Sequence, residues 1–253
     1  ISAMMYSLSL ILMIVLQPAG IMDCFGDWHR KSNCDPQEIK SHESWDALLQ
    51  KYVDDEGNVD YLGFKKEESE LDQYLAYLAQ NAVVDEDSKE EKLVYYINLY
   101  NAATVKLILD NYPTGSIKDI KSPWDRKWIK VGEKVLSLGA IEHKILRKLN
   151  EPRIHFAINC ASYSCPKLSN RAYSRDRLEE QLDAATSEFV NDAKRNRISK
   201  SGAEISQIFK WYKSDFTKNG SLVDYVNQYS KIDIDAATKV RYIKYDWSLN
   251  EAK

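Results

Sequence analysis

One run of the sequence constrains the fold more than any other, because it would be apolar on nearly every side of a helix. Residues 88–112 read SKEEKLVYYINLYNAATVKLILDNY, and Pro113 follows them. Ser88 and Glu91 form a capping box pattern, which pairs the first free amides of a helix. A helix that is apolar all round is buried on all sides. We therefore expect this helix to lie at the centre of the fold.

Other parts of the chain predict elements that pack around this helix. Apolar residues recur at helical spacing in four further segments, at residues 45–52, 67–80, 139–148 and 178–189. Residues 127–131 and 134–138 resemble two strands, and Gly132-Glu133 between them suits a type II′ hairpin turn. RIHFAI, residues 153–158, is the most strand-like run of the chain.

These patterns predict one helix-rich α+β domain over residues 45–253, built around a small β-sheet with the apolar helix at its centre. No internal repeat, low-complexity tract or Gly/Ser linker interrupts this region. With 253 residues and 44% hydrophobic side chains, the chain can bury a core of that size. One large domain fits the length better than two small ones.

The first 44 residues differ in composition from the rest. Residues 4–16, MMYSLSLILMIVL, carry no charge, a length that is too short to cross a bilayer but typical of a secretory signal. A buried N-terminal helix is the alternative. We expect residues 1–22 to be signal-like and residues 23–44 to be a polar arm, so the protein would be secreted or periplasmic with no stable membrane span. Asp23 directly before Cys24 disfavours a lipid anchor.

Charge and aromatic content limit the partners of this chain. Lys and Arg total 35 against 38 Asp and Glu, a net charge of −3 with both signs interspersed, so no basic footprint for nucleic acid is present. Sixteen tyrosines and six tryptophans suit either a thick core or a groove. We expect a small-molecule or peptide-like ligand, and Trp124 is a candidate to line its groove.

The expected compartment decides whether the four cysteines can form disulfides. In an oxidising compartment an even number of cysteines can pair fully. Cys24 and Cys34 enclose a polar stretch that a local disulfide would hold, and Cys160 and Cys165 are near enough to close a small ring. Four cysteines allow three complete pairings, and the sequence does not choose among them.

Cys160 is the best candidate for a nucleophile, since it follows the strand-like run and begins a polar loop. A cysteine needs a base or a positive neighbour to become a thiolate near neutral pH. His143 and His155 are the candidate bases, with Glu142 beside the former, and Asn159 could donate to an oxyanion. For each histidine alone, a purely structural role is the alternative.

Two buried amides are expected close to this cysteine. Asn98 and Asn101 share one face of the central helix, and a buried amide without partners would cost a few kcal/mol. They must therefore hold either the backbone of a neighbouring loop, such as the cysteine loop, or a ligand. The Cys-x4-Cys spacing with one nearby histidine lacks the two pairs of a zinc site, so we predict no metal and no cofactor.

Several long motifs resemble the family called domain of unknown function 547. They are INLYNAATVKLIL from Ile97, WDRKWIKVGEKVLSLGAIEHKILRK from Trp124, RIHFAINCASYSCPKL from Arg153, VDY at Val59 and YDWSLN at Tyr245. The resemblance implies that the candidate residues above, with Ser164, Cys165 and Pro166, occupy the family's motifs. It implies no established activity, and it agrees with export.

Two functions compete on these observations. The first is a thiol-dependent hydrolase or acyl transferase that acts on an amide or ester, with Cys160 as the nucleophile. The second is a non-enzymatic extracellular binding module, in which a Cys160–Cys165 disulfide staples a recognition loop. Asn98, Asn101, Ser164, Cys165 and Trp124 would contact the ligand.

Overall fold

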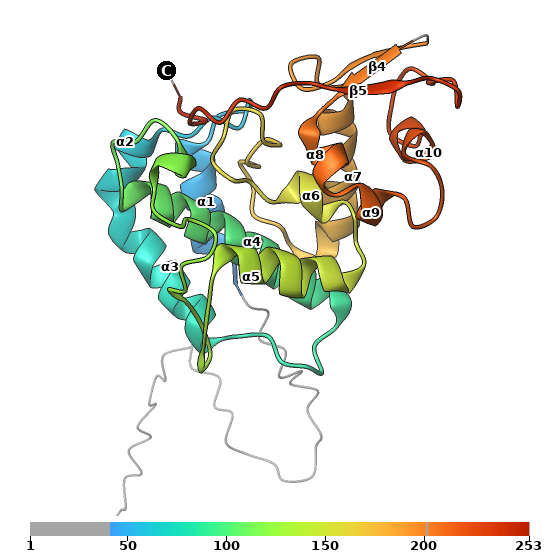
Figure 1. Ribbon diagram of the computed structural model, residues 1–253. Helices are drawn as coiled ribbons and strands as arrows, with labels where there is room; N and C mark the ends of the chain where they lie inside the picture. Colours follow the sequence, from blue (N-terminus) through green and yellow to red (C-terminus); the bar gives the residue numbers. More distant parts are fainter. Residues whose placement is uncertain (1–40, 201, 253) are drawn as a thin grey trace, which may run out of the picture. The chain divides into compact units, whose positions relative to one another are not determined.

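A computed structural model describes residues 41–200 and 202–252 of the chain (Figure 1). The signal-like segment and nearly all of the polar arm, with Cys24 and Cys34, lie outside the described residues. Residues 39–253 form one compact unit. Within it the helices and the short strands make an α+β fold, as the sequence predicted.

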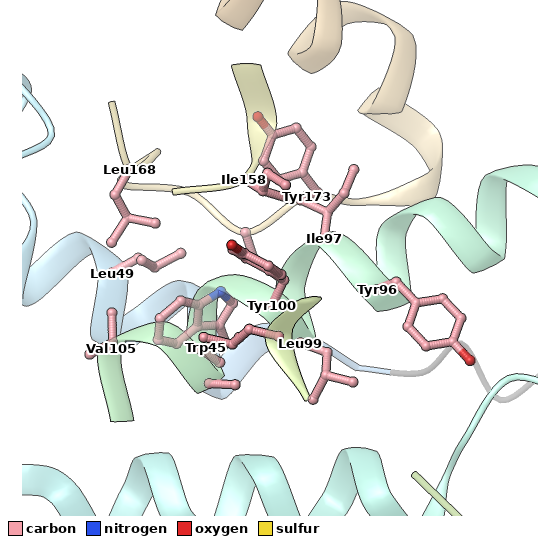
Figure 2. Close-up of a cluster of buried hydrophobic side chains, with 14 of the residues drawn as sticks. Trp45, Leu49, Tyr96, Ile97, Leu99, Tyr100, Val105, Ile158, Leu168 and Tyr173 are labelled. Atoms are coloured by element: carbon pink, nitrogen blue, oxygen red, sulfur yellow. The ribbon is translucent and has the colours of Figure 1, made fainter. Parts of the chain in front are cut away.

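The central helix is α4 (Lys89–Leu109), which begins at the predicted capping box of Ser88 and Glu91. Nearly every side chain from its second turn onward is buried. Helices α1 (Glu43–Tyr52) and α3 (Glu68–Gln80) belong to the core around it. Figure 2 shows Ile97, Leu99 and Tyr100 of α4 in one cluster with side chains of α1 and of the segment after residue 157. The expectation of a central, fully buried helix is confirmed.

The other elements are short, and several are single turns of 3-10 or π helix, which carry the prefix η. They are α2 (Tyr61–Phe64), η1 (Lys65–Glu67), η2 (Ile117–Asp119), β1 (Ile129–Val131), β2 (Lys134–Leu136), α5 (Leu138–Ala140), η3 (Ile141–Ile145), η4 (Leu146–Leu149), α6 (Ile154–Ala157), η5 (Arg175–Arg177), α7 (Leu178–Asn191), β3 (Arg197–Ser199), β4 (Gly202–Ile205), α8 (Gln207–Trp211), α9 (Lys213–Phe216), α10 (Leu222–Asn227) and β5 (Val240–Tyr242).

The described strands form two small sheets. Strands β1 and β2 make the predicted antiparallel hairpin, in which Ile129 pairs with Leu136 and Val131 with Lys134. Gly132 has a φ of 56°, the left-handed conformation that the turn requires and that glycine adopts without strain. In the second sheet β4 lies between β3, which is antiparallel to it, and β5, which is parallel.

Two hydrophobic clusters meet at the short helix α6. Ile154 and Ala157 of α6 pack in the cluster around α4. Phe156, between them in sequence, packs instead against the rings of Phe189, Phe209 and Phe216, at centroid distances of 5.1 to 5.6 Å for these pairs. The chain that follows α6 therefore leaves the junction of the two clusters, and this chain carries Cys160.

The prediction of a strand at RIHFAI is wrong, because the structure places the helical turn α6 there. The amide of His155 donates to the carbonyl of Pro152, and the amide of Ile158 donates to that of Ile154. Pro152 lies directly before Arg153, the N-cap of α6, whose backbone is already helical. A short, fully buried apolar run does not distinguish a strand from a helical turn. Residues 61–64 are likewise helical.

The two asparagines of α4 hold backbone segments that pass over the helix. The Asn98 amide donates to the carbonyl of Tyr173 at 2.8 Å and accepts from the Tyr173 amide at 3.0 Å. Asn101 donates to the Ala157 carbonyl at 2.9 Å and accepts from the Asn159 amide at 2.9 Å. The expected clasp on the cysteine loop is confirmed for Asn101, while Asn98 holds a later segment.

We predict that Asn98→Ala destabilises the protein by about 2–4 kcal/mol, because it leaves two buried backbone groups of Tyr173 unpaired. Urea unfolding followed by circular dichroism measures this change. The control is Asn81→Ala, at an exposed amide that bonds only within its own helix end, and it should cost less than about 1 kcal/mol. Equal losses in both variants would contradict the importance of the clasp.

Candidate functional site

The cysteine loop is braced by side chains that bond to its backbone. Asn101 holds the amide of Asn159, whose own side chain donates to the carbonyl of Pro166 at 2.7 Å and accepts from the amide of Ala161 at 2.7 Å. Ala161 has a φ of 57°, a left-handed conformation that costs a non-glycine residue about 1 kcal/mol or more. These bonds hold a sharp turn directly after Cys160.

The last segment of the chain also supports this loop. The amides of Tyr163 and Ser164 donate to the carbonyls of Ser248 and Asp246, and the amide of Asp246 donates to Ser164 Oγ at 2.9 Å. This segment follows β5 and runs from that strand back towards α2 (Figure 1). It places Tyr245 against the thiol of Cys160.

The Cys160 thiol lies among hydrogen-bond donors. Its sulfur is 3.1 Å from Ser162 Oγ and 3.5 Å from Tyr245 Oη, and its backbone amide donates to Cys165 Sγ at 3.0 Å. Hydrogen bonding from Cys165, Ser162 and Tyr245 outweighs burial and lowers the pKa of Cys160 to about 7. Burial and the neighbouring Cys160 sulfur raise the pKa of Cys165 well above its ordinary value. Cys160 is therefore the thiol that ionises first.

Neither cysteine is in a disulfide in the described part of the chain. Cys160 is partly buried and Cys165 is buried, and both are free thiols. The staple expected for a binding module is not formed in this state.

His155 is held in a fixed orientation beneath the site. Its Nε2 is 2.9 Å from Asp215 Oδ2, and its ring stacks on Tyr212 at a centroid distance of 3.9 Å. An ionised carboxylate only accepts, so Nε2 carries the hydrogen and Nδ1 keeps its lone pair. Burial lowers the pKa of His155, so the ring is neutral near pH 7. Its Nδ1 is buried and has no protein partner.

Asp215 joins this histidine to an arginine. Arg147 donates to both carboxylate oxygens of Asp215, at 2.6 and 2.9 Å. Burial opposes ionisation of Asp215, but the bonds from His155 and Arg147 outweigh it and hold the pKa of this carboxyl below its ordinary value. Asp215 is therefore a fixed negative charge that orients the imidazole.

Glu142 and His143 lie in η3, a π turn within the helical stretch that Ser137 caps. Such turns interrupt α-helices and are frequent at functional sites. Glu142 is 5% exposed, whereas the side chain of His143 is 51% exposed. Tyr100 donates to Glu142 Oε2 over a long 3.4 Å and the Tyr212 hydroxyl also lies near this carboxylate, while Glu142 Oε1 has no hydrogen-bond partner within the described residues. The carboxylate is therefore poorly satisfied for a buried group.

One cavity of about 260 Å³ brings these groups together. It is lined by four of the predicted catalytic residues, two of the predicted binding residues and several aromatic rings: Tyr100, Trp124, Glu142, His143, His155, Ile158, Cys160, Cys165, Pro166, Ile208, Trp211, Tyr212, Tyr245 and Trp247. The other predicted site residues, Asn98, Asn101, Asn159 and Ser164, do not line it and hold backbone instead.

No histidine of the described residues hydrogen-bonds directly to the Cys160 sulfur, whose side-chain partners are Ser162 and Tyr245. His143 and His155 nevertheless line the same cavity. A gap between nucleophile and base is common before substrate binds. The side chain of Asn159 is bonded to the loop backbone at Pro166 and Ala161. The predicted role of Asn159 as an oxyanion donor is therefore assigned to another group.

Sequence reasoning missed Tyr100, Ser162, Asp215 and Tyr245. Tyr245 stands in the YDWSLN motif and Ser162 lies between the two cysteines. These positions mark both residues as candidates but do not indicate that they contact the Cys160 sulfur. Asp215 gave no sequence signal. It lies in a surface-like KSDF segment, and its partner His155 is 60 residues away in sequence.

A second cavity, of about 250 Å³, lies beside α7 and holds no nucleophile. Its charges largely pair with one another, as Lys167 does with Glu188 at 2.6 Å. No group of three or more His, Cys, Asp or Glu side chains in residues 41–200 and 202–252 is arranged to bind a metal ion. In the same residues, no helix is long and apolar enough to cross a membrane.

Comparison with known proteins finds a family match for part of the chain. Residues 84–190 match the family model described as "Protein of unknown function, DUF547". The match spans α4, the hairpin, the π turn and the cysteine loop, and it agrees with the resemblance of the sequence motifs to this family. No curated protein and no solved structure matches the chain. Tyr212, Asp215 and Tyr245 of the cavity lie beyond the matched residues.

We predict that Cys160 is alkylated by iodoacetamide with a pH midpoint near 7, whereas Cys165 is not alkylated in the native protein. The rate should rise with pH through this midpoint, because only the thiolate reacts. Tyr245→Phe removes one donor to the sulfur and should raise the midpoint by about half to one pH unit. Mass spectrometry of the alkylated peptides measures both thiols.

The matched control is Tyr163→Phe, at an exposed ring on the same loop. It should leave the midpoint unchanged. A wild-type midpoint near that of an ordinary thiol would contradict the assignment of donors to Cys160.

Proposed function

We propose that this protein is a thiol-dependent hydrolase or acyl transferase that acts on an amide or ester, with Cys160 as the nucleophile. The observation that carries the proposal is the position of Cys160, a thiol with a lowered pKa, on the same cavity as an oriented, neutral imidazole. The apolar run at residues 4–16 supports a secreted or periplasmic location for this activity.

The first half of the reaction forms a thioester. The Cys160 sulfur attacks the carbonyl carbon of the substrate, and His155 Nδ1 takes the thiol proton. Asp215 stabilises the imidazolium that results, since it accepts from the opposite ring nitrogen. The imidazolium then donates this proton to the leaving amine or alkoxide as the carbon–heteroatom bond breaks.

The second half restores the enzyme. Water, or an acceptor amine or alcohol, loses a proton to His155 and attacks the thioester carbon. The Cys160 sulfur leaves as a thiolate and takes this proton back from His155. Ser162 Oγ donates to Tyr245 Oη at 2.9 Å, so the Tyr245 hydroxyl, 3.5 Å from the sulfur in the free protein, is the nearest side-chain donor for negative charge on the substrate oxygen. The backbone amides of Cys160 and Ala161 are already bonded to Cys165 and Asn159.

The alternative is a non-enzymatic binding module. The aromatic lining of the cavity favours it, because such rings also serve recognition without chemistry. In that case Cys160 would contribute only to the shape of the loop. A Cys160→Ser variant would then keep ligand binding, and the protein would show no acyl chemistry.

The test is turnover of p-nitrophenyl acetate, whose activated ester reacts with weak thiol nucleophiles. We expect release of p-nitrophenol and an acetyl group on Cys160 by mass spectrometry. Cys160→Ser should abolish both, and His155→Gln should lower the rate by about 10² to 10⁴. Cys165→Ser should keep a measurable rate. His143→Gln, at a mainly exposed ring, should change it little.

Circular dichroism and urea unfolding of each variant separate lost chemistry from lost fold. Retention of wild-type turnover in folded Cys160→Ser would exclude the thiol mechanism.

A further inference from the structure

Two buried polar atoms on the cavity wall are hydrogen-bond acceptors without a donor. Within the described residues, Glu142 Oε1 and His155 Nδ1 have no hydrogen-bond partner, and both side chains are at least nine-tenths buried. Cys160 adds a sulfur that ionises readily and then only accepts. A buried acceptor without a donor costs about 1–3 kcal/mol, and more if it is charged. A ligand that fits this cavity must therefore bring donors.

No lysine or arginine of the described residues is bonded to Glu142. Neither residue type is among those that line the cavity, and Arg147, whose charge lies near enough to interact with Glu142, is bound to Asp215 through two bonds. His143 Nδ1 is 3.8 Å from Glu142 Oε1, but Arg147 Nη1 lies 3.5 Å from that same Nδ1. At 3.8 Å the His143–Glu142 pair is beyond hydrogen-bond distance. The negative charge of Glu142 remains open to a ligand.

The rest of the wall suits a cation as well. Trp211 stacks on Trp247 at 5.8 Å, and Trp124 meets Trp247 edge to face at the same distance. Aromatic faces attract ammonium and guanidinium groups, and here Lys118 already lies 5.2 Å from the centre of a Trp247 ring. An alkyl ammonium matches this combination of rings and one buried carboxylate better than a neutral or anionic group does.

We propose that the substrate of this site carries a protonated amine, which binds to Glu142 inside the aromatic cavity and presents a neighbouring acyl carbon to Cys160. This inference deepens the proposed function. That the amine is a substrate rests on the proposed thiol chemistry, whereas the binding of an amine does not. The substrate class is thus an amino-bearing amide or ester, such as an aminoacyl compound or a peptide with a free amine.

The charge preference is tested with three thiol reagents that share the methanethiosulfonate group and carry a positive, no or a negative charge: 2-aminoethyl, methyl and 2-sulfonatoethyl methanethiosulfonate. Their rates with Cys160 are measured at one pH and divided by their rates with 2-mercaptoethanol, so that the thiolate fraction cancels in every ratio between reagents. We expect the cation to be favoured over the anion by about tenfold or more. In Glu142→Gln this preference should fall to within about twofold.

The matched control is Glu133→Gln, which removes the same charge at an exposed hairpin turn outside the cavity. It should keep the full preference. Equal relative rates for the three reagents in the wild-type protein, or an unchanged preference in Glu142→Gln, would overturn the inference while leaving the thiol chemistry intact.

A second measurement does not require a reactive thiol. In Cys160→Ser, butylammonium should change the tryptophan fluorescence of the cavity, while butanol and butyrate at equal concentration should not. Glu142→Gln added to this variant should abolish the response. If Cys160 proved inert, the proposed function would fail and this titration alone would decide on amine binding: no selective response to butylammonium would overturn it.

Discussion

A single buried amide connects the centre of this fold to its chemistry. Asn101 sits on the central helix α4 and bonds to the backbone on both sides of Ile158, at the Ala157 carbonyl and the Asn159 amide. The short helix α6 and the cysteine loop are thereby fixed to α4 at the place where two hydrophobic clusters meet. Because both partners are buried, the bond has no competing water, and the position of Cys160 follows from that of the core.

Once the cysteine loop is fixed, the surroundings of Cys160 depend on which other segments pack against this loop. The C-terminal segment pairs with the loop and delivers Tyr245, while α8 and the residues after it deliver Trp211 and Tyr212. The cavity is thus lined by stretches of chain that are far apart in sequence, from Tyr100 to Trp247. Its donors gather around the sulfur and its unpaired acceptors lie on Glu142 and His155. The hydrogen bonds to the sulfur lower the pKa of Cys160. The unpaired acceptors can take hydrogen bonds from a ligand.

The sequence predicted the parts of the site better than their arrangement. The cavity is lined by Cys160, His143, His155 and Glu142. These residues could be predicted because they stand in segments with strong local patterns, the helix around residues 139–148 and the run before the cysteine. Asn159 was assigned to an oxyanion, but its side chain bonds to the loop that carries it. The run at residues 153–158 was assigned to a strand, since a short buried run has the same composition in either conformation.

What the sequence determined by itself is the central helix, its capping box, the hairpin turn at Gly132 and the presence of a thiol beside imidazole and carboxylate groups. These depend on contacts between near neighbours in the chain, so periodicity and residue type suffice. Only the tertiary structure decided that Asp215 orients His155 and that Tyr245 reaches Cys160, pairs separated by 60 and 85 residues. Such contacts arise from the packing of whole elements, and no local pattern encodes which distant side chain will fill a given space.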